Sequence, residues 1–141
     1  LCDAETPVWL AAELRTPAVE DWLRFHCNCP FVEPEGAAFA FGSPVALAEA
    51  LERLPEGEAD WPDRSATLVV LVPTLTEGAA LRLSGPGVDG TARLPLGPVR
   101  DAVAALHAPN RGSFPLGRDL ILCAGDRVAA LPRSARIERE G

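Results

Sequence analysis

The sequence has 141 residues, of which 48% are hydrophobic and 23% are charged, and its formal net charge is −7. This length fits a single domain over residues 1–141 with a substantial buried core, and the composition is typical of globular proteins. An acidic chain is poorly suited to general nucleic-acid binding, which needs a basic surface. No apolar run approaches the roughly 20 residues that cross a bilayer, so neither nucleic acid nor membrane is an expected partner.

The ionisable side chains offer little for catalysis. All 13 basic residues are arginine, so the chain can form no Schiff base and no covalent pyridoxal phosphate site. The lysine-containing phosphate loop is excluded for the same reason. His26 and His107 are the only ordinary general bases near neutral pH. We therefore predict no catalytic residue and no cofactor.

The chain begins Leu1-Cys2-Asp3, without an initiating Met and without the basic start of a signal peptide. Its four cysteines have apolar neighbours, which predicts reduced thiols in a cytoplasmic protein. The run His26-Cys27-Asn28-Cys29 contains metal-ligand residue types, but zinc ligands usually come in paired clusters and only one cluster is present. We favour packing at a helix end for these residues and predict no metal site.

Two helices are predicted in the first half of the chain, each beginning with a capping residue followed by proline. Thr16-Pro17 begins a helix that ends at Asn28, and Ser43-Pro44 begins another that ends before Pro55. On the first helix, helical spacing places four side chains on one buried face: Val19, Trp22, Leu23 and His26. Short strands are expected at residues 1–3 and 37–41, and residues 56–60 are expected to form an acidic surface loop.

A solid apolar run from Leu68 to Val72 predicts a strand that is covered on both faces. A polar corner, Asp63-Arg64-Ser65, precedes it. Residues 74–78 turn the chain, and residues 79–84 then alternate between apolar and polar side chains, as in a half-buried strand. The short connection predicts a hairpin between these two strands.

The second half of the chain continues the mixture of strands and helices. An edge strand is predicted over residues 91–96 because Pro95 lacks a backbone donor. A third helix begins at Pro98, and further strands are expected at residues 120–124, 128–131 and 135–138. This pattern predicts a layered α/β fold with a mixed sheet and helices covering both faces.

Two corners that contain arginine precede the two buried strands, and they could meet in space. Asp63, Arg64 and Ser65 precede the first strand, and Arg118 with Asp119 precedes the second. A guanidinium fork binds phosphate and carboxylate groups, so these residues are candidates for binding an anionic ligand. The alternative is an internal Asp–Arg pair that fixes the start of a strand.

A glycine-rich loop is a weaker candidate. Ser84, Gly85 and Gly87 could present backbone N–H groups to a phosphate. The loop does not open a helix and lacks the G-x-G-x-x-G pattern, so a tight loop at a subunit contact is at least as well supported. The arginines near the C-terminus are interpreted as a solvated strand face: Arg133, Arg136 and Arg139.

Six segments together resemble the PhnH family, the H subunit of the bacterial carbon–phosphorus lyase core complex. They occur in the family's order: D-A-E-T-P-V-W-L (3–10), L-R-F-H (23–26), P-D-R-S-A-T-L-V (62–69), L-S-G-P-G-V (83–88), F-P-L-G-R-D-L-I-L (114–122) and L-P-R-S-A-R-I (131–137). The resemblance covers essentially the whole chain, and the set is specific although no single segment is. Departures fall at residues 27–29 and 134–135. Family members carry an additional N-terminal segment, whose absence agrees with the missing initiating Met.

The resemblance implies a three-layer α/β/α sandwich, similar to the large domain of pyridoxal-phosphate-dependent transferases but without that cofactor. It also implies a homodimer that joins the G, I and J subunits. That assembly makes ribose 1-alkylphosphonate 5-triphosphate from ATP and an alkylphosphonate, and its nucleosidase and radical chemistry are assigned to other subunits. We therefore expect an accessory, non-catalytic subunit of a transferase complex. The alternative is a subunit that binds nucleotide or phosphonate through Arg64, Arg118 and the Gly85–Gly87 loop and contributes directly to the transferase step.

Overall fold

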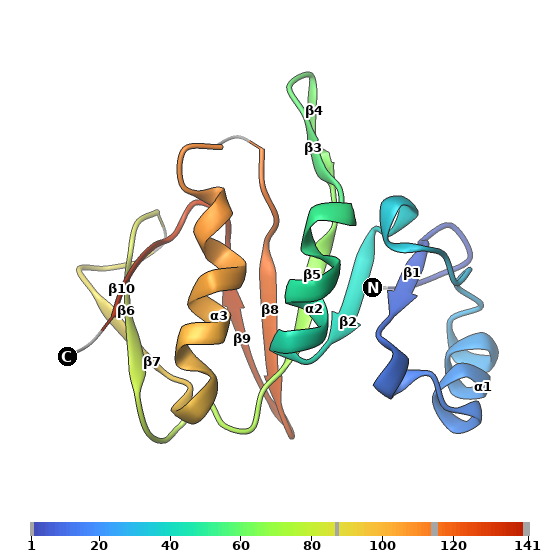
Figure 1. Cartoon of the computed structure of the whole chain (residues 1–141), viewed down its shortest axis with the longest axis horizontal. Helices are drawn as coiled ribbons and strands as arrows, with labels where there is room; N and C mark the ends of the chain where they lie inside the picture. The colour runs from blue at the N-terminus through green and yellow to red at the C-terminus, as the bar shows by residue number, and fades with distance from the viewer. Residues whose placement is uncertain (1, 87, 114–115, 140–141) are drawn as a thin grey trace.

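The computed structural model describes residues 2–86, 88–113 and 116–139, and it shows an α/β fold with a mixed sheet, as predicted (Figure 1). The central sheet has five strands in the order β1-β2-β5-β8-β9. The first four run parallel and β9 runs antiparallel to β8. Their bounds are Val8–Leu10 (β1), Phe39–Gly42 (β2), Thr67–Leu71 (β5), Leu120–Ala124 (β8) and Arg127–Leu131 (β9).

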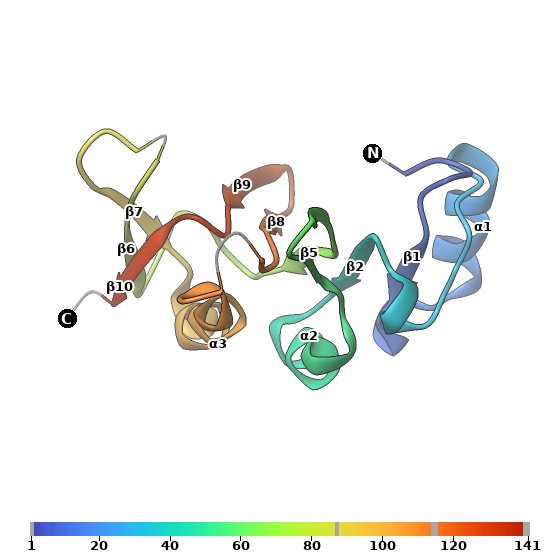
Figure 2. The same cartoon turned by 90° about the horizontal axis from the view of Figure 1, so that it is seen from above.

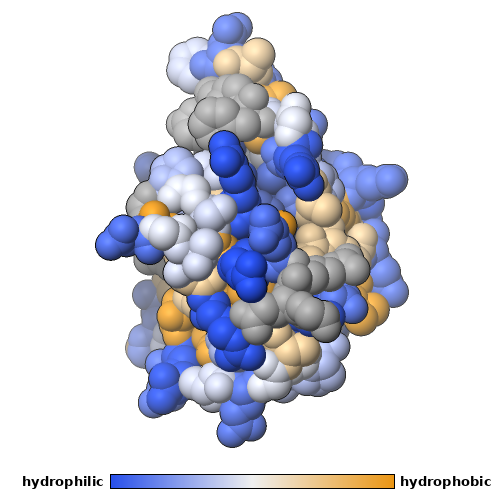
Figure 3. All heavy atoms as spheres, turned by 90° about the vertical axis from the view of Figure 1, so that its left-hand side faces the viewer, coloured by the Kyte–Doolittle hydropathy of each residue, from blue (hydrophilic) through white to orange (hydrophobic). Residues whose placement is uncertain are grey.

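The other strands of the described residues form two smaller sheets. An antiparallel sheet of three strands has the order β10-β6-β7, and a separate hairpin consists of β3 and β4. Their bounds are Glu56–Glu58 (β3), Trp61–Ser65 (β4), Ala80–Ser84 (β6), Ala92–Pro95 (β7) and Arg136–Arg139 (β10). The strand β7 lies at the edge of its sheet, as Pro95 predicted. The outer face of this sheet is mostly hydrophilic (Figure 3) and carries exposed Arg82, Arg93 and Arg136.

In the described part of the chain, three α-helices and five short 3₁₀ turns connect the strands. The α-helices are Pro17–His26 (α1), Pro44–Ala50 (α2) and Arg100–His107 (α3), and the 3₁₀ turns are Ala12–Leu14, Pro34–Gly36, Leu51–Arg53, Gly97–Val99 and Ala108–Asn110. The predicted caps are confirmed: Thr16 Oγ1 accepts a hydrogen bond from the Val19 N–H (3.3 Å), and Ser43 Oγ accepts one from the Ala46 N–H (3.2 Å). No helix among the described residues is long and apolar enough to cross a bilayer.

The main core lies between the central sheet and the pair α2 and α3 (Figure 2). Leu68 and Val70 of β5 and Leu120 and Leu122 of β8 are fully buried there with Leu47 of α2. The inner face of the three-stranded sheet contributes to the same core. Burying a leucine or valine side chain stabilises the fold by about 2 kcal/mol, so this cluster is the largest apolar contribution to stability. A second, smaller cluster packs α1 against β1 and β2.

Helices do not cover the two faces of the central sheet equally. Both α2 and α3 lie on one face, whereas α1 lies at the far end of the sheet beyond the edge strand β1 (Figure 2). Within the described residues, no helix covers the opposite face of β5, β8 and β9. Leu71 and Val128, which point to that face, are 40% and 67% exposed. The prediction of helices on both faces therefore holds only for the α1 end.

The predicted hairpin between residues 68–72 and 79–84 is wrong. Both edges of β5 are paired in parallel, one with β2 and the other with β8, so no edge remains for β6. Instead β6 pairs with β7 and β10 in the separate sheet. The connection passes Gly78, whose φ is +83° and where a Cβ would lie 2.8 Å from the Gly97 Cα, so a close backbone approach replaces the expected turn.

Three further predictions need correction. No strand covers the described residues 2 and 3; the chain turns there, because Asp3 Oδ1 accepts hydrogen bonds from the Glu5 N–H (2.9 Å) and the Thr6 hydroxyl (2.8 Å). Trp22, which is 57% exposed, and His26 are exposed rather than buried, because α1 directs Val19 and Leu23 into the second cluster and lies at the end of the molecule. The acidic stretch 56–60 and the polar corner 63–65 belong to the hairpin β3–β4 rather than to loops.

Candidate functional site

Ser65 of the first predicted polar corner lies near Asp119 of the second, at the edge of the central sheet where β5 and β8 begin and β9 ends. Ser65 closes β4 just before β5, Asp119 precedes β8, and Arg133 follows β9. The antiparallel return of β9 brings Arg133 back to the start of β8, since Leu131 pairs with Leu120. We call this group, together with Arg118 and Asn110, the polar cluster.

Arg133 connects the two corners. Its backbone N–H donates to Asp119 Oδ1 (2.7 Å), its Nε donates to the same oxygen (3.2 Å), and its Nη2 donates to Asp119 Oδ2 (3.0 Å). The same Nη2 donates to Ser65 Oγ (2.6 Å). Burial alone would raise the pKa of the Asp119 carboxyl, but the hydrogen bonds from Arg133 outweigh it and hold that pKa below its ordinary value. The arrangement stabilises Asp119 as a carboxylate.

Arg118 is buried, with 7% of its surface exposed, and it bonds to backbone rather than to a carboxylate. Its Nε and Nη2 both donate to the Leu54 carbonyl, at 3.2 and 2.7 Å. Asn110 holds the backbone of the same residue, accepting from the Arg118 N–H (2.8 Å) and donating to its carbonyl (2.9 Å). Burial lowers the pKa of the guanidinium. The fork that was predicted to bind an anion is thus occupied by the chain itself.

The polar cluster fixes the root of the β3–β4 hairpin. The Gly117 N–H donates to the Glu56 carbonyl (2.9 Å), and the Ala66 N–H donates to the Pro55 carbonyl (2.8 Å). The bonds from Gly117 to Glu56 and from Arg118 to Leu54 tie the β3 side of the hairpin to the residues before β8. The bond from Ala66 to Pro55 joins the two ends of the hairpin to each other, and the bond from Arg133 to Ser65 holds the end of β4.

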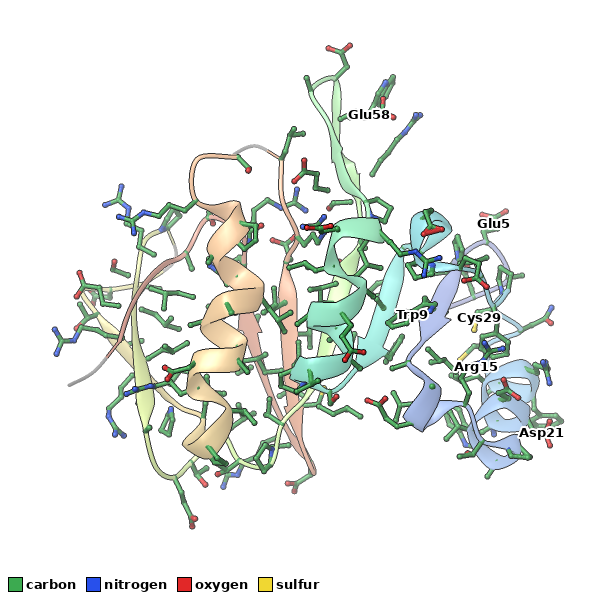
Figure 4. The ribbon with its side chains drawn as sticks, viewed as in Figure 1. Glu5, Trp9, Arg15, Asp21, Cys29 and Glu58 are labelled. Carbon is green, nitrogen blue, oxygen red and sulfur yellow. The ribbon has the colours of Figure 1, made fainter. Side chains whose placement is uncertain are left out.

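Beyond the root, the hairpin projects from the rest of the molecule (Figures 1 and 4). Trp61 is 50% exposed, and the Arg64 guanidinium lies 4.4 Å from the centroid of its ring, a cation–π distance. Arg64 is therefore on the hairpin and not among the buried groups with Ser65. The side chain of Asp63, which was predicted with them, lies outside the described residues.

The predicted glycine loop lies beside the chain that follows Arg133. Gly85 has φ of +121°, and a Cβ there would lie 3.2 Å from the Ser134 carbonyl oxygen. The Val88 N–H donates to the Gly85 carbonyl (3.0 Å) and closes the loop that begins at Ser84. Gly87 lies outside the described residues. The backbone approach explains the glycine at 85, and phosphate binding by this loop stays a prediction.

Sequence reasoning missed the role of Arg133. It was assigned with Arg136 to a solvated strand face, but only 14% of its side chain is exposed and it lies in the loop before β10. Pro132 could have indicated this, because a proline breaks the strand pattern just before Arg133. His107 was also unassigned. Its Nε2 lies 2.8 Å from the Pro132 carbonyl oxygen, and burial lowers the pKa of its imidazole.

Three of the cysteines and two hollows of the surface lie together at the α1 end of the described chain. Cys29 is buried, and it lies with Cys2 and Cys27 in the apolar cluster under α1, where burial raises the pKa of the Cys2 and Cys29 thiols. Among the described residues, no group of three or more His, Cys, Asp or Glu side chains could hold a metal ion. A small hollow of about 180 Å³ lies at the same end beside Trp9 and Arg15 (Figure 4). It is below the usual volume of a small-molecule site, whereas a second hollow of about 470 Å³, beside Arg24, Asn28 and Phe31, is within that range.

The structure defines an α/β protein with a mixed sheet, in which the side chains of the polar cluster bond to one another and to backbone. Over residues 1–138 the chain matches the family described as "Bacterial phosphonate metabolism protein (PhnH)". The chain therefore belongs to the PhnH family, in agreement with the resemblance found in the sequence.

Two relatives are similar over most of the chain. One is the alpha-D-ribose 1-methylphosphonate 5-triphosphate synthase subunit PhnH of Rhizobium meliloti (strain 1021), 38% identical over 142 residues that cover 99% of this chain and 70% of the relative. Another is the putative C-P lyase subunit protein HtxG of Stutzerimonas stutzeri, 36% identical over 132 residues that cover 94% of this chain and 66% of the relative. The chain thus spans about two thirds of the length of these relatives.

Proposed function

We propose that this chain is an accessory subunit of a multi-subunit complex that breaks down organic phosphonates. In this role it is needed for forming ribose 1-alkylphosphonate 5-triphosphate from ATP and an alkylphosphonate, without supplying a catalytic residue. The observation that carries the proposal is membership of the PhnH family, whose two relatives above are both named as subunits. The polar cluster supports it, because Arg118, Asp119 and Arg133 bind groups of the chain itself.

The proposal also covers the partners of the chain, its place in the cell and its fold. The chain acts in the cytoplasm as one domain, forms a homodimer, and joins the G, I and J subunits of the complex. Its fold is the cofactor-free counterpart of the large domain of pyridoxal-phosphate-dependent transferases, with a third layer on the sheet face that α2 and α3 leave open. The exposure of Leu71 and Val128 on that face supports the third layer, because apolar strand residues are usually covered.

Co-purification tests this function. The chain is mixed with purified G, I and J subunits, the products are sized by light scattering, and triphosphate synthesis is measured with and without the chain. We expect a stoichiometric complex and a loss of synthesis when the chain is omitted. A chain that stays apart from the other subunits, or synthesis that proceeds equally well without it, would contradict the proposal.

A second function is supported by one observation: the Arg64 guanidinium is exposed and lies outside the buried cluster. A nucleotide or phosphonate could bind there and involve this subunit directly in the transferase step. In that case Arg64→Ala should abolish synthesis and leave the complex assembled. Normal synthesis by Arg64→Ala would exclude Arg64 from a substrate site.

A further inference from the structure

The β3–β4 hairpin has few contacts beyond its root. Its two strands pair with each other, Glu56 opposite Ser65 and Glu58 opposite Trp61, and both extend away from the central sheet (Figures 1 and 4). A two-stranded hairpin alone is marginally stable in water. A projecting hairpin therefore needs an anchor, and the polar cluster supplies one. A buried set of hydrogen bonds that holds an exposed arm in one direction indicates that the arm has a task outside the chain.

The side chains of the arm suit protein recognition better than ligand binding. Trp61 is half exposed and belongs to neither apolar cluster, so its indole contributes nothing to the core. Tryptophan and arginine are the residues most enriched where binding energy concentrates at interfaces, and here Arg64 stacks on Trp61. Stacking fixes both side chains before binding, which lowers the entropy lost on association.

The charge of the arm limits the class of partner that it can bind. Between residues 56 and 65 the sequence carries four carboxylates, Glu56, Glu58, Asp60 and Asp63, against the single Arg64. This negative field repels phosphate and phosphonate groups. It attracts a protein surface with basic side chains, and the indole requires an apolar pocket within that surface.

The geometry also decides how the arm is recognised. Its register shifts between Glu56 and Glu58, and a bulge of this kind twists a strand and interrupts its regular hydrogen-bonding edge. Charged side chains on a short, twisted edge disfavour the addition of another strand. Recognition by the side chains, with Trp61 as the anchor, is the mode that remains.

We propose that the β3–β4 hairpin is a docking arm that inserts Trp61 into an apolar pocket with a basic rim on another subunit of the complex. This inference rests on the proposed function, because it names the surface by which the subunit joins its partners. It assigns the polar cluster a positioning role: Arg118, Asp119 and Arg133 set the direction of the arm.

The experiment compares two exposed tryptophans. Trp61→Ala removes the anchor, and Trp22→Ala removes an indole of similar exposure on α1, at the other end of the sheet. Binding of each variant to the purified complex of the G, I and J subunits is measured by calorimetry at two salt concentrations. We expect Trp61→Ala to weaken binding by about tenfold or more, and Trp22→Ala to change it by less than about twofold. The double reversal Glu58→Arg with Asp60→Arg should also weaken binding, most strongly at low salt.

The outcomes separate this inference from the function on which it rests. If the unaltered chain binds the other subunits and the Trp61→Ala variant binds them equally well, the docking arm is wrong and the subunit function stands. A chain that never binds the other subunits overturns both. If Trp61→Ala instead abolishes the homodimer and leaves subunit binding intact, the arm contacts a second copy and the inference is wrong. Near-unchanged thermal unfolding of Trp61→Ala, checked beside each titration, confirms that the variant is folded.

Discussion

The root and the tip of the β3–β4 hairpin use the same residue types for opposite purposes. At the root, Arg118 is buried, Asp119 is partly buried with 39% of its side chain exposed, and both bond to other groups of the chain. At the tip, Arg64 and the acids around Trp61 face water and make few bonds to the rest of the molecule. In the sequence, both the root and the tip have an acidic residue next to an arginine. Burial, rather than residue type, therefore decides which of the two places has a structural role.

The difference in burial predicts how substitutions in the two regions will affect stability. A buried charge is tolerated only when it is bonded, and removing one partner leaves the other unsatisfied. An exposed pair contributes little, as for the ion pair between Arg53 and Glu35 on the surface. Substitutions at the root should therefore lower stability, and substitutions at the tip should spare stability and change binding.

The largest loss of stability is expected from Gly117→Ala. Gly117 has φ of +134°, which side chains rarely adopt, and a Cβ would overlap Asn110 Oδ1, the atom that accepts from the Arg118 N–H. The variant should lose about 3 kcal/mol in the free energy of unfolding, measured by urea denaturation. Gly125→Ala is the control: its φ is +61° but no atom lies within 4 Å of the added methyl, so the loss should be about 1 kcal/mol. Equal losses in the two variants would show that Asn110 does not constrain this position.

A smaller loss is expected from Arg118→Ala, because the Leu54 carbonyl loses both donors from the guanidinium. The release of a buried charge offsets part of this, so the expected destabilisation is about 2 kcal/mol. Arg111→Ala, in the same connection but exposed, should change the free energy of unfolding by less than about 0.5 kcal/mol. If Arg118→Ala is as stable as Arg111→Ala, the guanidinium is not what holds the root.

The root should also make stability depend on pH. Burial lowers the pKa of His107, and the bonds from Arg133 lower the pKa of Asp119, so the unfolded chain takes up protons at a higher pH than the folded chain. The stability from these groups is present above their unfolded pKa values and is lost as pH falls, from about 6.5 for the histidine and about 4 for the aspartate. Urea titrations between pH 8 and pH 4 should show the first decline.

A matched pair of variants assigns the first decline. His107→Gln keeps a donor toward the Pro132 carbonyl but cannot titrate, so it should flatten the profile between about pH 7 and pH 5.5. His26→Gln serves as the control because that ring is exposed on α1. A decline that persists unchanged in His107→Gln would assign it to another group.

The contrast between root and tip also shows what the sequence could predict. The helix starts at Thr16 and Ser43 were correct because a cap and a proline are local signals. The corners were expected to meet in space because each precedes a buried strand, and the structure brings together Ser65 and Asp119 but not Arg64. The false pairing of β5 with residues 79–84 arose because short connections favour hairpins, whereas both edges of β5 are taken by strands distant in sequence. The place of Arg133 beside Asp119 depends on the antiparallel return of β9 along β8, and the only local signal for it was the break at Pro132.

The smallest effect on stability is expected at the tip. Measuring it tests whether the tip is independent of the fold. Trp61→Ala and Arg64→Ala each remove one half of an exposed stack, which is worth about 0.5–1 kcal/mol at such sites. If the stack stabilises the hairpin alone, the two variants should lose similar small amounts, and the double variant should lose no more than the larger of them. Thermal unfolding of the three variants measures this coupling. A loss as large as that of Gly117→Ala would show that the tip supports the fold, and the division of the hairpin into a structural root and a free tip would be wrong.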